Sequence, residues 1–294
     1  MKIVVLGGMG YIGSALCELY RNGCDDEILL VDNRMIPERI AALPPHIGYV
    51  QADIADLDYM RHVTADADVV HFLAAQVEAE MSVHREEAVW RDNFELPKSV
   101  IEIIPSSTRV LWASSGNVFG GVNEAEKYMD LDETDTPRPK YPYAETKFAM
   151  EQFLHQHNGQ HTIVRFGTNY GYAPGIRFNL VTNIFARKAI LGESLTIHGA
   201  GLNYRPTCCV NDCARALDFL ARREDTNRET YHVVNESLQI KDLARTVIDS
   251  VASDSELNFV AKEVPFSAYA LSNAKIRGLG FEFPPTQAAD LVTL

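Results

Sequence analysis

Short apolar runs alternate with longer amphipathic stretches along the first 170 residues of the chain. The runs are rich in Val, Ile and Leu, which is typical of buried strands, and the stretches between them have apolar residues at helical spacing. Alternation of this kind predicts a Rossmann-type, doubly wound parallel α/β sheet with helices on both faces. The predicted strands lie at residues 3–6, 27–31, 48–52, 69–73, 109–113 and 162–166.

Glycine and proline interrupt this alternation beyond about residue 168, so we expect a smaller C-terminal lobe that holds a substrate. Two later segments, in contrast, have the patterns of regular secondary structure. Residues 211–222 have the apolar spacing of a helix, and residues 231–234 fit one more strand of the main sheet. The expected organisation is therefore a nucleotide-binding domain over 1–167, to which 211–235 return, and an interleaved substrate lobe over 168–210 and 236–294.

The segment that follows the first strand carries Gly7, Gly10 and Gly13 and leads directly into a helix. In this context one glycine allows the tight turn, one lets the backbone approach a pyrophosphate, and one lets the helix pack on the strand. The second strand ends in Asp32, at the spacing expected for a carboxylate that binds a ribose hydroxyl. The pattern predicts NAD, and the nearby Arg34 softens the preference against NADP.

Tyr143 and Lys147 stand four residues apart, just after Pro142, which suits the first position of a helix. Residues at this spacing share a helix face. An ammonium group beside the phenol is expected to lower the phenol pKa from about 10 toward neutral and to make Tyr143 a general acid/base. Ser115, at the end of the fifth strand, has a hydroxyl that can hold a substrate oxygen beside it.

Taken together, these residues resemble the extended short-chain dehydrogenase/reductase family, in particular its NAD-dependent nucleotide-sugar epimerase/dehydratase branch. The resemblance runs through nearly the whole chain. It implies that Tyr143 takes a proton from a sugar hydroxyl as hydride moves to NAD, that Lys147 holds the nicotinamide ribose, and that Ser115 holds the sugar oxygen. It also implies that Asn93 supports the site. Further segments that carry it are 165–171, 177–180, 195–199, 204–205 and 269–281.

The same resemblance, with the patterns above, assigns two sets of binding residues. The expected NAD contacts are Gly7, Gly10, Tyr11, Ile12, Gly13, Asp32, Asn33, Asp53, Ile54, Leu73, Ala74, Ala75, Lys147 and Phe166. The expected contacts to a nucleotide-sugar substrate are Ser115, Tyr143, Thr168, Asn179, Thr196, His198 and Arg205. Asn179 and Arg205 match positions that meet the pyrophosphate, and the strand from Thr196 to His198 matches the one that meets the base.

The predicted reaction is that of an NAD-dependent nucleotide-sugar 4-epimerase or 4-dehydrogenase, an enzyme that forms a 4-keto sugar. The 4,6-dehydratases of the resembled family have an Asp-Glu pair where this chain has Gly116 and Asn117, so loss of water is not expected. Two alternatives stay open. One is an NAD(P)H-dependent 4-ketosugar reductase, and the other is a non-catalytic NAD-binding sensor on the same fold.

Composition narrows the possible partners. A formal net charge of −13 over 294 residues argues against nucleic acid as a partner, and no apolar stretch reaches the length of a membrane span. The chain starts directly in its first strand, so a cytoplasmic location is expected. By resemblance, the long helices at 90–104 and 144–157 are expected to pair with a second copy in a four-helix bundle, giving a homodimer.

Two residue types that often mark sites have ordinary explanations here. The five cysteines have no paired spacing, so we expect packed, reduced thiols and no metal site. His71, in the middle of an apolar run, is expected to be a packed histidine of the core.

Overall fold

The computed structural model describes residues 1–21, 25–77, 82–120, 130–261 and 269–284. Its largest unit is a seven-stranded sheet in the order β11-β7-β5-β4-β1-β2-β3, and each neighbouring pair in it is parallel. The predicted parallel sheet is therefore confirmed, including the late strand that joins its edge beside β7. The seven strands are β1 (Lys2–Leu6), β2 (Glu27–Asp32), β3 (Ile47–Gln51), β4 (Val69–Phe72), β5 (Arg109–Ser115), β7 (His161–Phe166) and β11 (Glu229–Val233).

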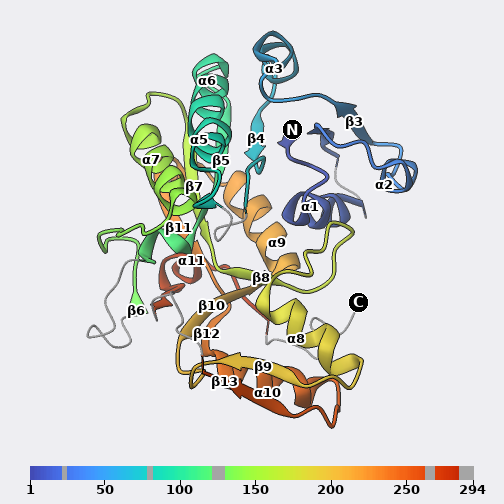
Figure 1. Ribbon diagram of the computed structural model, residues 1–294. Helices are drawn as coiled ribbons and strands as arrows, with labels where there is room; N and C mark the ends of the chain where they lie inside the picture. Colours follow the sequence, from blue (N-terminus) through green and yellow to red (C-terminus); the bar gives the residue numbers. More distant parts are fainter. Residues whose placement is uncertain (22–24, 78–81, 121–129, 262–268, 285–294) are drawn as a thin grey trace.

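Helices cover both faces of this sheet (Figure 1). Along β1, Val4 and Leu6 point into one apolar core and Val5 points into the other, as the alternation of side chains in a strand requires. One core includes side chains of α3, α6 and α7, and the other includes side chains of α1 and α9. The bounds are α1 (Tyr11–Arg21), α3 (Leu57–Thr64), α6 (Leu96–Ile103), α7 (Pro142–Gln156) and α9 (Val210–Ala221); the short α2 is Pro37–Ala41.

The predicted helix at 90–104 starts earlier and is less regular than expected. Residues 86–103 form α5 (Glu86–Trp90), a π-helical turn η1 (Arg91–Glu95) and then α6. A π turn within a helix frequently marks a functional site, because it displaces side chains from the regular helical spacing. Here the turn carries Asn93.

The remaining elements build smaller sheets outside the large one (Figure 1). Strand β10 pairs with β8 and β12, β9 pairs with β13, and β6 pairs with β14. Helices α8 and α10 pack together in a separate apolar core with β9. The bounds are β6 (Asp130–Leu131), β8 (Thr168–Tyr170), α8 (Val181–Ile190), β9 (Leu195–His198), β10 (Tyr204–Cys209), β12 (Glu236–Gln239), α10 (Ile240–Ser250), β13 (Leu257–Val260), β14 (Ala270–Leu271) and α11 (Ala274–Gly278), with short 3₁₀ turns η2 (Gly116–Phe119) and η3 (Glu224–Thr226).

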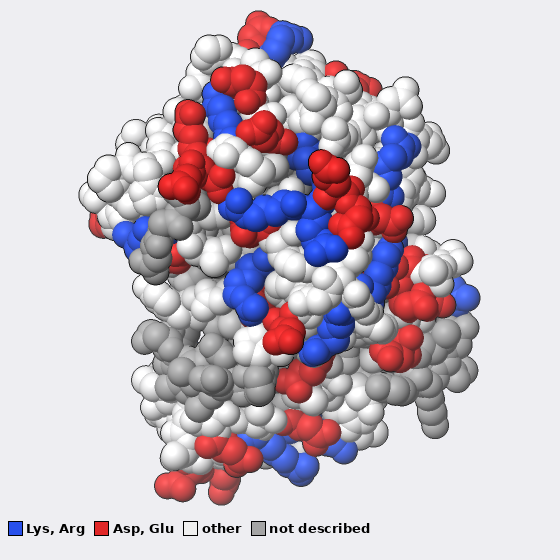
Figure 2. Space-filling view, turned by 180° about the vertical axis from the view of Figure 1, so that it is seen from behind, with Lys and Arg blue, Asp and Glu red and all other residues white. Residues whose placement is uncertain are grey.

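The surface carries charges of both signs. On the face seen in Figure 2, acidic and basic side chains lie interspersed. Among the described residues, no helix combines the length and the apolar character that crossing a membrane would require. Nor does the described part of the chain gather three or more His, Cys, Asp or Glu side chains in an arrangement that suits a metal ion.

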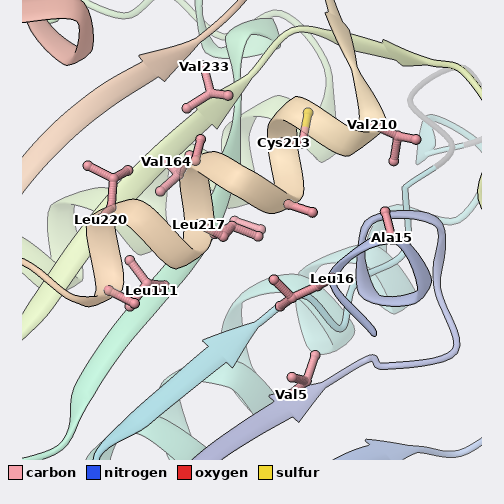
Figure 3. Close-up of a cluster of buried hydrophobic side chains, with 14 of the residues drawn as sticks. Val5, Ala15, Leu16, Leu111, Val164, Val210, Cys213, Leu217, Leu220 and Val233 are labelled. Atoms are coloured by element: carbon pink, nitrogen blue, oxygen red, sulfur yellow. The ribbon is translucent and has the colours of Figure 1, made fainter. Parts of the chain in front are cut away.

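Helix α9 packs beside α1 on one face of the large sheet although it lies about 200 residues away from α1 in sequence (Figure 3). Leu217 and Leu220 of α9 share one apolar core with Leu16 of α1 and Val5 of β1. Buried apolar area of this kind is the main source of folding free energy. It explains why the chain returns to the large sheet after β8, α8, β9 and β10.

The cysteines and His71 behave as expected. Cys17, Cys208, Cys209 and Cys213 are buried and packed in apolar cores and form no disulfide with one another, and Cys24 lies outside the described residues. His71 is fully buried, and burial lowers its pKa to about 4. A histidine held neutral in this way is part of the packing of the sheet.

Candidate active site

A cavity of about 1020 Å³ opens at the carboxyl ends of the strands, where parallel sheets of this type bind ligands. It extends from the glycine-rich loop after β1 to Tyr269, which precedes β14. The structure brings most of the predicted site residues together along its wall. These are Gly7, Gly10, Tyr11, Ile12, Gly13, Asp32, Asn33, Asp53, Ile54, Leu73, Ala74, Ala75, Ser115, Tyr143, Lys147, Phe166 and Thr168.

The glycine-rich loop is packed too closely for side chains. Gly7 has a φ of +88°, and a Cβ atom placed there would lie 2.6 Å from the backbone nitrogen of Ala74. A Cβ atom on Gly13 would lie 2.5 Å from the carbonyl oxygen of Gly7. The backbone can therefore turn into α1 at the cavity wall, where the N-terminus of the helix favours a phosphate group. This cradle fits the pyrophosphate of a dinucleotide.

Asp32 closes the cavity at the end that suits an adenosine. Its buried carboxylate accepts hydrogen bonds from the backbone N–H of Met9 (2.9 Å) and from Nε and Nη2 of Arg34 (3.1 and 3.2 Å). Asn33 Nδ2 donates to Asp53 at 3.1 Å. The guanidinium of Arg34 thus lies directly on the carboxylate predicted to bind ribose, and its side chain is 54% exposed. It neutralises part of the charge by which Asp32 disfavours NADP.

Ser115, Tyr143 and Lys147 lie together at the opposite, buried end. Helix α7 begins at Pro142 as predicted, and this start places Tyr143 and Lys147 on its inward side. Lys147 Nζ donates to the carbonyl oxygen of Ala113 at 2.8 Å and lies 4.5 Å from the centre of the Trp112 ring. Burial lowers the pKa of Lys147 to about 7.

The expected lowering of the Tyr143 pKa is wrong in direction. Burial of the phenol raises its pKa, and the hydrogen bond with Ser115 and the positive charge of Arg177 only partly oppose this. Lys147 is not among the groups that shift this pKa. Its Nζ instead binds the backbone of β5 and the Trp112 ring. The sequence spacing correctly put both residues on one helix face, but it did not show where the lysine reaches.

Asn93 supports the site through the backbone. It is fully buried in the π turn η1, where its Oδ1 accepts from the N–H of Gln76 (2.7 Å) and its Nδ2 donates to the carbonyl of Gln76 (2.9 Å). Gln76 lies in the segment after β4 and lines the cavity. The resemblance implied a supporting role for Asn93, and these two hydrogen bonds fix the backbone of Gln76 in the cavity wall.

Asn117 and Tyr269 form the wall beside the buried end. Tyr269 donates a hydrogen bond to Asn117 Oδ1 at 3.2 Å, and burial raises the pKa of Tyr269 to about 12. A Cβ atom on Gly116 would lie 2.7 Å from Cδ1 of Leu271. An acidic side chain at position 116 would therefore require Leu271 to move, and the amide of Asn117 supplies no acid or base.

Four predicted substrate contacts lie away from the cavity wall. Asn179 is exposed two residues beyond Arg177, Thr196 and His198 lie on β9, and Arg205 lies on β10. The charge of Arg205 still reaches Tyr269 and favours its ionised form. The cavity wall also contains residues to which the sequence analysis assigned no role: Gln76, Val77, Asn169, Gly175, Arg177 and Tyr269. Of these, Arg177 and Tyr269 could have been found from the sequence, since both stand in segments that resemble the family.

Comparison with known proteins gives the family. The model of the NAD dependent epimerase/dehydratase family matches residues 3–235. The chain belongs to this family. It is 25% identical over 297 aligned residues to the low-salt glycan biosynthesis protein Agl12 of Haloferax volcanii, covering 96% of this chain and 93% of that protein. It is 28% identical over 225 residues to a putative UDP-glucose 4-epimerase of Methanocaldococcus jannaschii, covering 73% of this chain and 71% of that protein.

The fold also matches solved members of this group. The UDP-glucuronic acid 4-epimerase of Bacillus cereus, solved with UDP-glucuronic acid and NAD, superposes with a TM-score of 0.86 at 21% identity, covering 99% of this chain and 96% of that one. Membership of the family confirms the predicted enzyme class and the predicted cofactor NAD. A sensor without catalysis is set aside, because the chain belongs to a family of NAD-dependent enzymes.

Proposed function

We propose that this protein is an NAD-dependent nucleotide-sugar 4-epimerase or 4-dehydrogenase in which Tyr143 is the acid/base. The observation that carries the proposal is the gathering of Ser115, Tyr143 and Lys147 at the buried end of the cavity that also contains the glycine cradle. If the pyrophosphate of NAD lies on that cradle, the nicotinamide ring and its ribose extend along the cavity toward Tyr143. Epimerase names among the relatives support the choice of reaction.

Each residue has a physical role in this proposal. NAD, when bound, accepts hydride from the sugar carbon. Tyr143 takes the proton from the hydroxyl on that carbon, while the hydroxyl of Ser115 holds the same oxygen and orients it. Lys147, whose Nζ donates to the carbonyl of Ala113 in β5, has the role of holding the nicotinamide ribose in this proposal. Burial excludes water from this end and strengthens every electrostatic contact there.

The wall beside Ser115 favours a 4-epimerase or 4-dehydrogenase over a dehydratase. An acidic side chain at position 116 would have to displace Leu271, and the amide of Asn117 is engaged by Tyr269. Removal of water from the sugar needs a second acid/base pair beside the phenol. The described wall supplies only neutral groups at these two positions.

The test is incubation of the purified protein with UDP-, GDP-, dTDP- and CDP-sugars, followed through the absorbance band of reduced nicotinamide and by mass spectrometry of the products. An epimerase gives the C4 epimer without net reduction of NAD. A 4-dehydrogenase gives a keto sugar and one reduced NAD per sugar. Absence of any spectral or chemical change across the panel would refute the proposal.

A 4-ketosugar reductase is the second candidate, and the contact between Arg34 and Asp32 favours it. A guanidinium that already lies on the ribose-binding carboxylate supplies a partner for the additional phosphate of NADPH. A reductase consumes NADPH or NADH in proportion to the keto sugar supplied, whereas an epimerase does not. Stoichiometric consumption of reduced cofactor with a 4-keto nucleotide sugar would decide for this candidate.

We also propose that the protein forms a homodimer through the surface of α5, α6 and α7. Figure 1 shows these helices together on one side of the molecule. Trp90 and Phe94 meet edge to face with 5.6 Å between ring centres, and the partly buried Phe153 lies on the neighbouring α7. Partly exposed aromatic side chains are common at interfaces.

Light scattering tests this proposal: the mass of a dimer is expected, and Phe153→Glu should give a monomer. The cytoplasmic location stays a prediction.

A further inference from the structure

A buried carboxylate on α7 joins the helix to two strands of the large sheet, directly behind the reaction end of the cavity. Glu151 is 1% exposed, and its Oε1 accepts hydrogen bonds from Ser114 Oγ and, at 3.0 Å, from Arg165 Nε. Its Oε2 accepts from Arg165 Nη2 at 2.7 Å. Ser114 and Arg165 are register partners in the parallel pairing of β5 with β7. One side chain of α7 therefore fixes the helix to both strands at a single register.

This carboxylate lies next to the part of β5 that carries the proposed chemistry. Ser114 stands between Ala113, whose carbonyl accepts from Lys147 Nζ at 2.8 Å, and Ser115, which lines the cavity. Lys147 and Glu151 are four residues apart and both point to the buried side of α7. Burial lowers the pKa of Lys147, and the charge of Glu151 partly opposes this. Two successive turns of α7 are thus attached to adjacent residues of β5.

Arg165, the other partner of the carboxylate, is itself held by further elements. Its guanidinium lies 5.1 Å from the centre of the Phe119 ring in η2, and its Nη1 lies 3.4 Å from His232 Nε2 in β11. His232 stays neutral, because burial and the charge of Arg165 lower its pKa to about 3. The charge of Arg165 is therefore balanced by Glu151, and the guanidinium that binds Glu151 is fixed in place by η2 and β11.

Stability alone does not explain a buried ion pair of this kind. Taking two charges out of water costs free energy that their attraction repays only in part, and well-packed apolar side chains of similar volume often give an equally stable protein. Hydrogen bonds to a carboxylate, in contrast, are directional, and in a buried network they hold their partners in one geometry. What this ion pair adds to the fold is a defined distance and orientation between α7 and the two strands.

We propose that Glu151 is a positioning residue, whose carboxylate fixes α7 against β5 through Ser114. It thereby sets the place of Tyr143 and Lys147 relative to Ser115. The inference rests on the proposed function, which assigns these three residues their roles in the reaction. A displacement of about 1 Å between reacting groups can reduce the rate by about a hundredfold. A helix attached at one register avoids such a displacement.

The first test removes one link of the network and leaves the ion pair intact. In Ser114→Ala, Glu151 loses its bond to β5 but keeps its bonds to Arg165, so the fold should persist. The substrate for the kinetics is the member of the UDP-, GDP-, dTDP- and CDP-sugar panel that reacts fastest with the wild type. We expect kcat to fall by about tenfold, a fraction of the loss that 1 Å of misplacement causes. KM and the affinity for NAD should stay near the wild-type values.

Thr108→Val is the matched control for this variant. It also removes a buried hydroxyl hydrogen bond, the one from Thr108 Oγ1 to the carbonyl of Ala67 (2.7 Å), directly before the other end of β5. Thr108 does not line the cavity, so kcat, KM and NAD affinity should equal those of the wild type. A difference in kcat between Ser114→Ala and Thr108→Val then reports the position of the hydroxyl and not the loss of a buried hydrogen bond as such.

The second test replaces the whole network by apolar side chains. A triple variant with Ser114→Ala, Glu151→Met and Arg165→Met leaves no charge of the ion pair buried without its counter-charge. Its free energy of unfolding, measured by chemical denaturation, should equal or exceed that of the wild type. Its kcat should nevertheless fall by about a hundredfold, because apolar contacts do not fix the register of α7. A loss of rate without a loss of stability distinguishes a positioning residue from a structural one.

Several outcomes would overturn the inference. Equal kcat values for Ser114→Ala and Thr108→Val would show that the link to β5 has no part in the reaction. Losses of kcat that follow losses of unfolding free energy or of bound NAD would make Glu151 a structural residue. A higher KM at unchanged kcat would place the effect on substrate binding. If no sugar of the panel reacts with the wild type, the proposed function fails and this inference with it, whereas a reacting wild type with unaffected variants contradicts the inference alone.

Discussion

The two ends of the cavity differ in how their charged groups are stabilised. At the adenosine end, the carboxylates of Asp32 and Asp53 accept hydrogen bonds from Arg34 and Asn33. Asp32 is buried, but its guanidinium partner is half exposed. At the reaction end, Tyr143 and Lys147 are buried, and desolvation is the largest influence on the pKa of each. Charges near water are balanced by neighbours that can exchange partners, whereas buried groups respond to the loss of water itself.

This difference shows where function is sensitive to a single change. An ion pair with one exposed partner, such as Arg34–Asp32, contributes less free energy than a fully buried pair, because water and salt can replace the exposed partner. A buried polar group has no such replacement. We therefore expect substitutions at the reaction end and directly behind it to have the largest effects, those in the cradle to come next, and those at the adenosine surface to have the smallest.

The largest expected effect is that of Tyr143→Phe. The variant keeps the packing of the ring but removes the proton acceptor, so kcat should fall by about a thousandfold or more. NAD content, measured on the released nucleotide, should match that of the wild type, since the phenol is proposed to act on the sugar. Near-normal turnover of Tyr143→Phe would show that the acid/base lies elsewhere. The buried end would then no longer be the part of the cavity most sensitive to substitution.

The second effect lies directly behind the reaction end. Glu151, one turn beyond Lys147, is buried with Arg165, whose Nη2 lies 2.7 Å from its carboxylate, and also accepts a hydrogen bond from Ser114. Glu151→Gln leaves a buried guanidinium without its counter-charge and should lower the free energy of unfolding by about 3–5 kcal/mol. Chemical denaturation measures this. The exposed pair Lys98–Glu102 is the control, and Glu102→Gln should cost under about 0.5 kcal/mol.

The cradle comes third. Gly13→Ala puts a Cβ atom 2.5 Å from a backbone oxygen, so the loop must shift and NAD affinity should fall by about a hundredfold or more. Calorimetric titration with NAD measures the change. Gly278→Ala is the matched control, because a Cβ atom there meets nothing within 4 Å. Equal NAD affinity in both variants would show that the close packing of the loop is not required.

The fourth effect is a dependence of stability on pH. The folded-state pKa of Lys147 is lowered to about 7 from its ordinary value of 10.5, so between these values the unfolded chain binds more protons than the folded one. Stability from this group is therefore present above the higher value and is lost as pH falls toward the lower one. Relative to Lys147→Met, the wild type should gain about 2 kcal/mol between about pH 7 and about pH 9. Parallel curves of unfolding free energy for the two proteins would contradict this.

The smallest effect is expected at the adenosine surface. Arg34→Leu removes the guanidinium from Asp32 and leaves the carboxylate free for the ribose hydroxyls. NAD affinity should change by no more than about threefold, while affinity for NADP should fall by about tenfold. Titration with both nucleotides gives the ratio. A large loss of NAD affinity would show that Arg34 organises this end, contrary to the comparison drawn above.

The sequence alone determined the parts of this protein that local patterning encodes. Apolar runs predicted the seven strands of the large sheet, the glycines predicted the cradle, and Pro142 marked the start of the helix that carries Tyr143. These features depend on residues close together in sequence, where strand alternation, helix spacing and close backbone packing leave their own signature.

Only the tertiary structure decided the electrostatics of the site. Lys147 turns to Ala113 and Trp112, and burial is the largest influence on the pKa of Tyr143. Tyr269 reaches Asn117 across more than 150 residues of sequence. Burial and long-range charge depend on which distant segments meet, and no local pattern in the sequence carries that information.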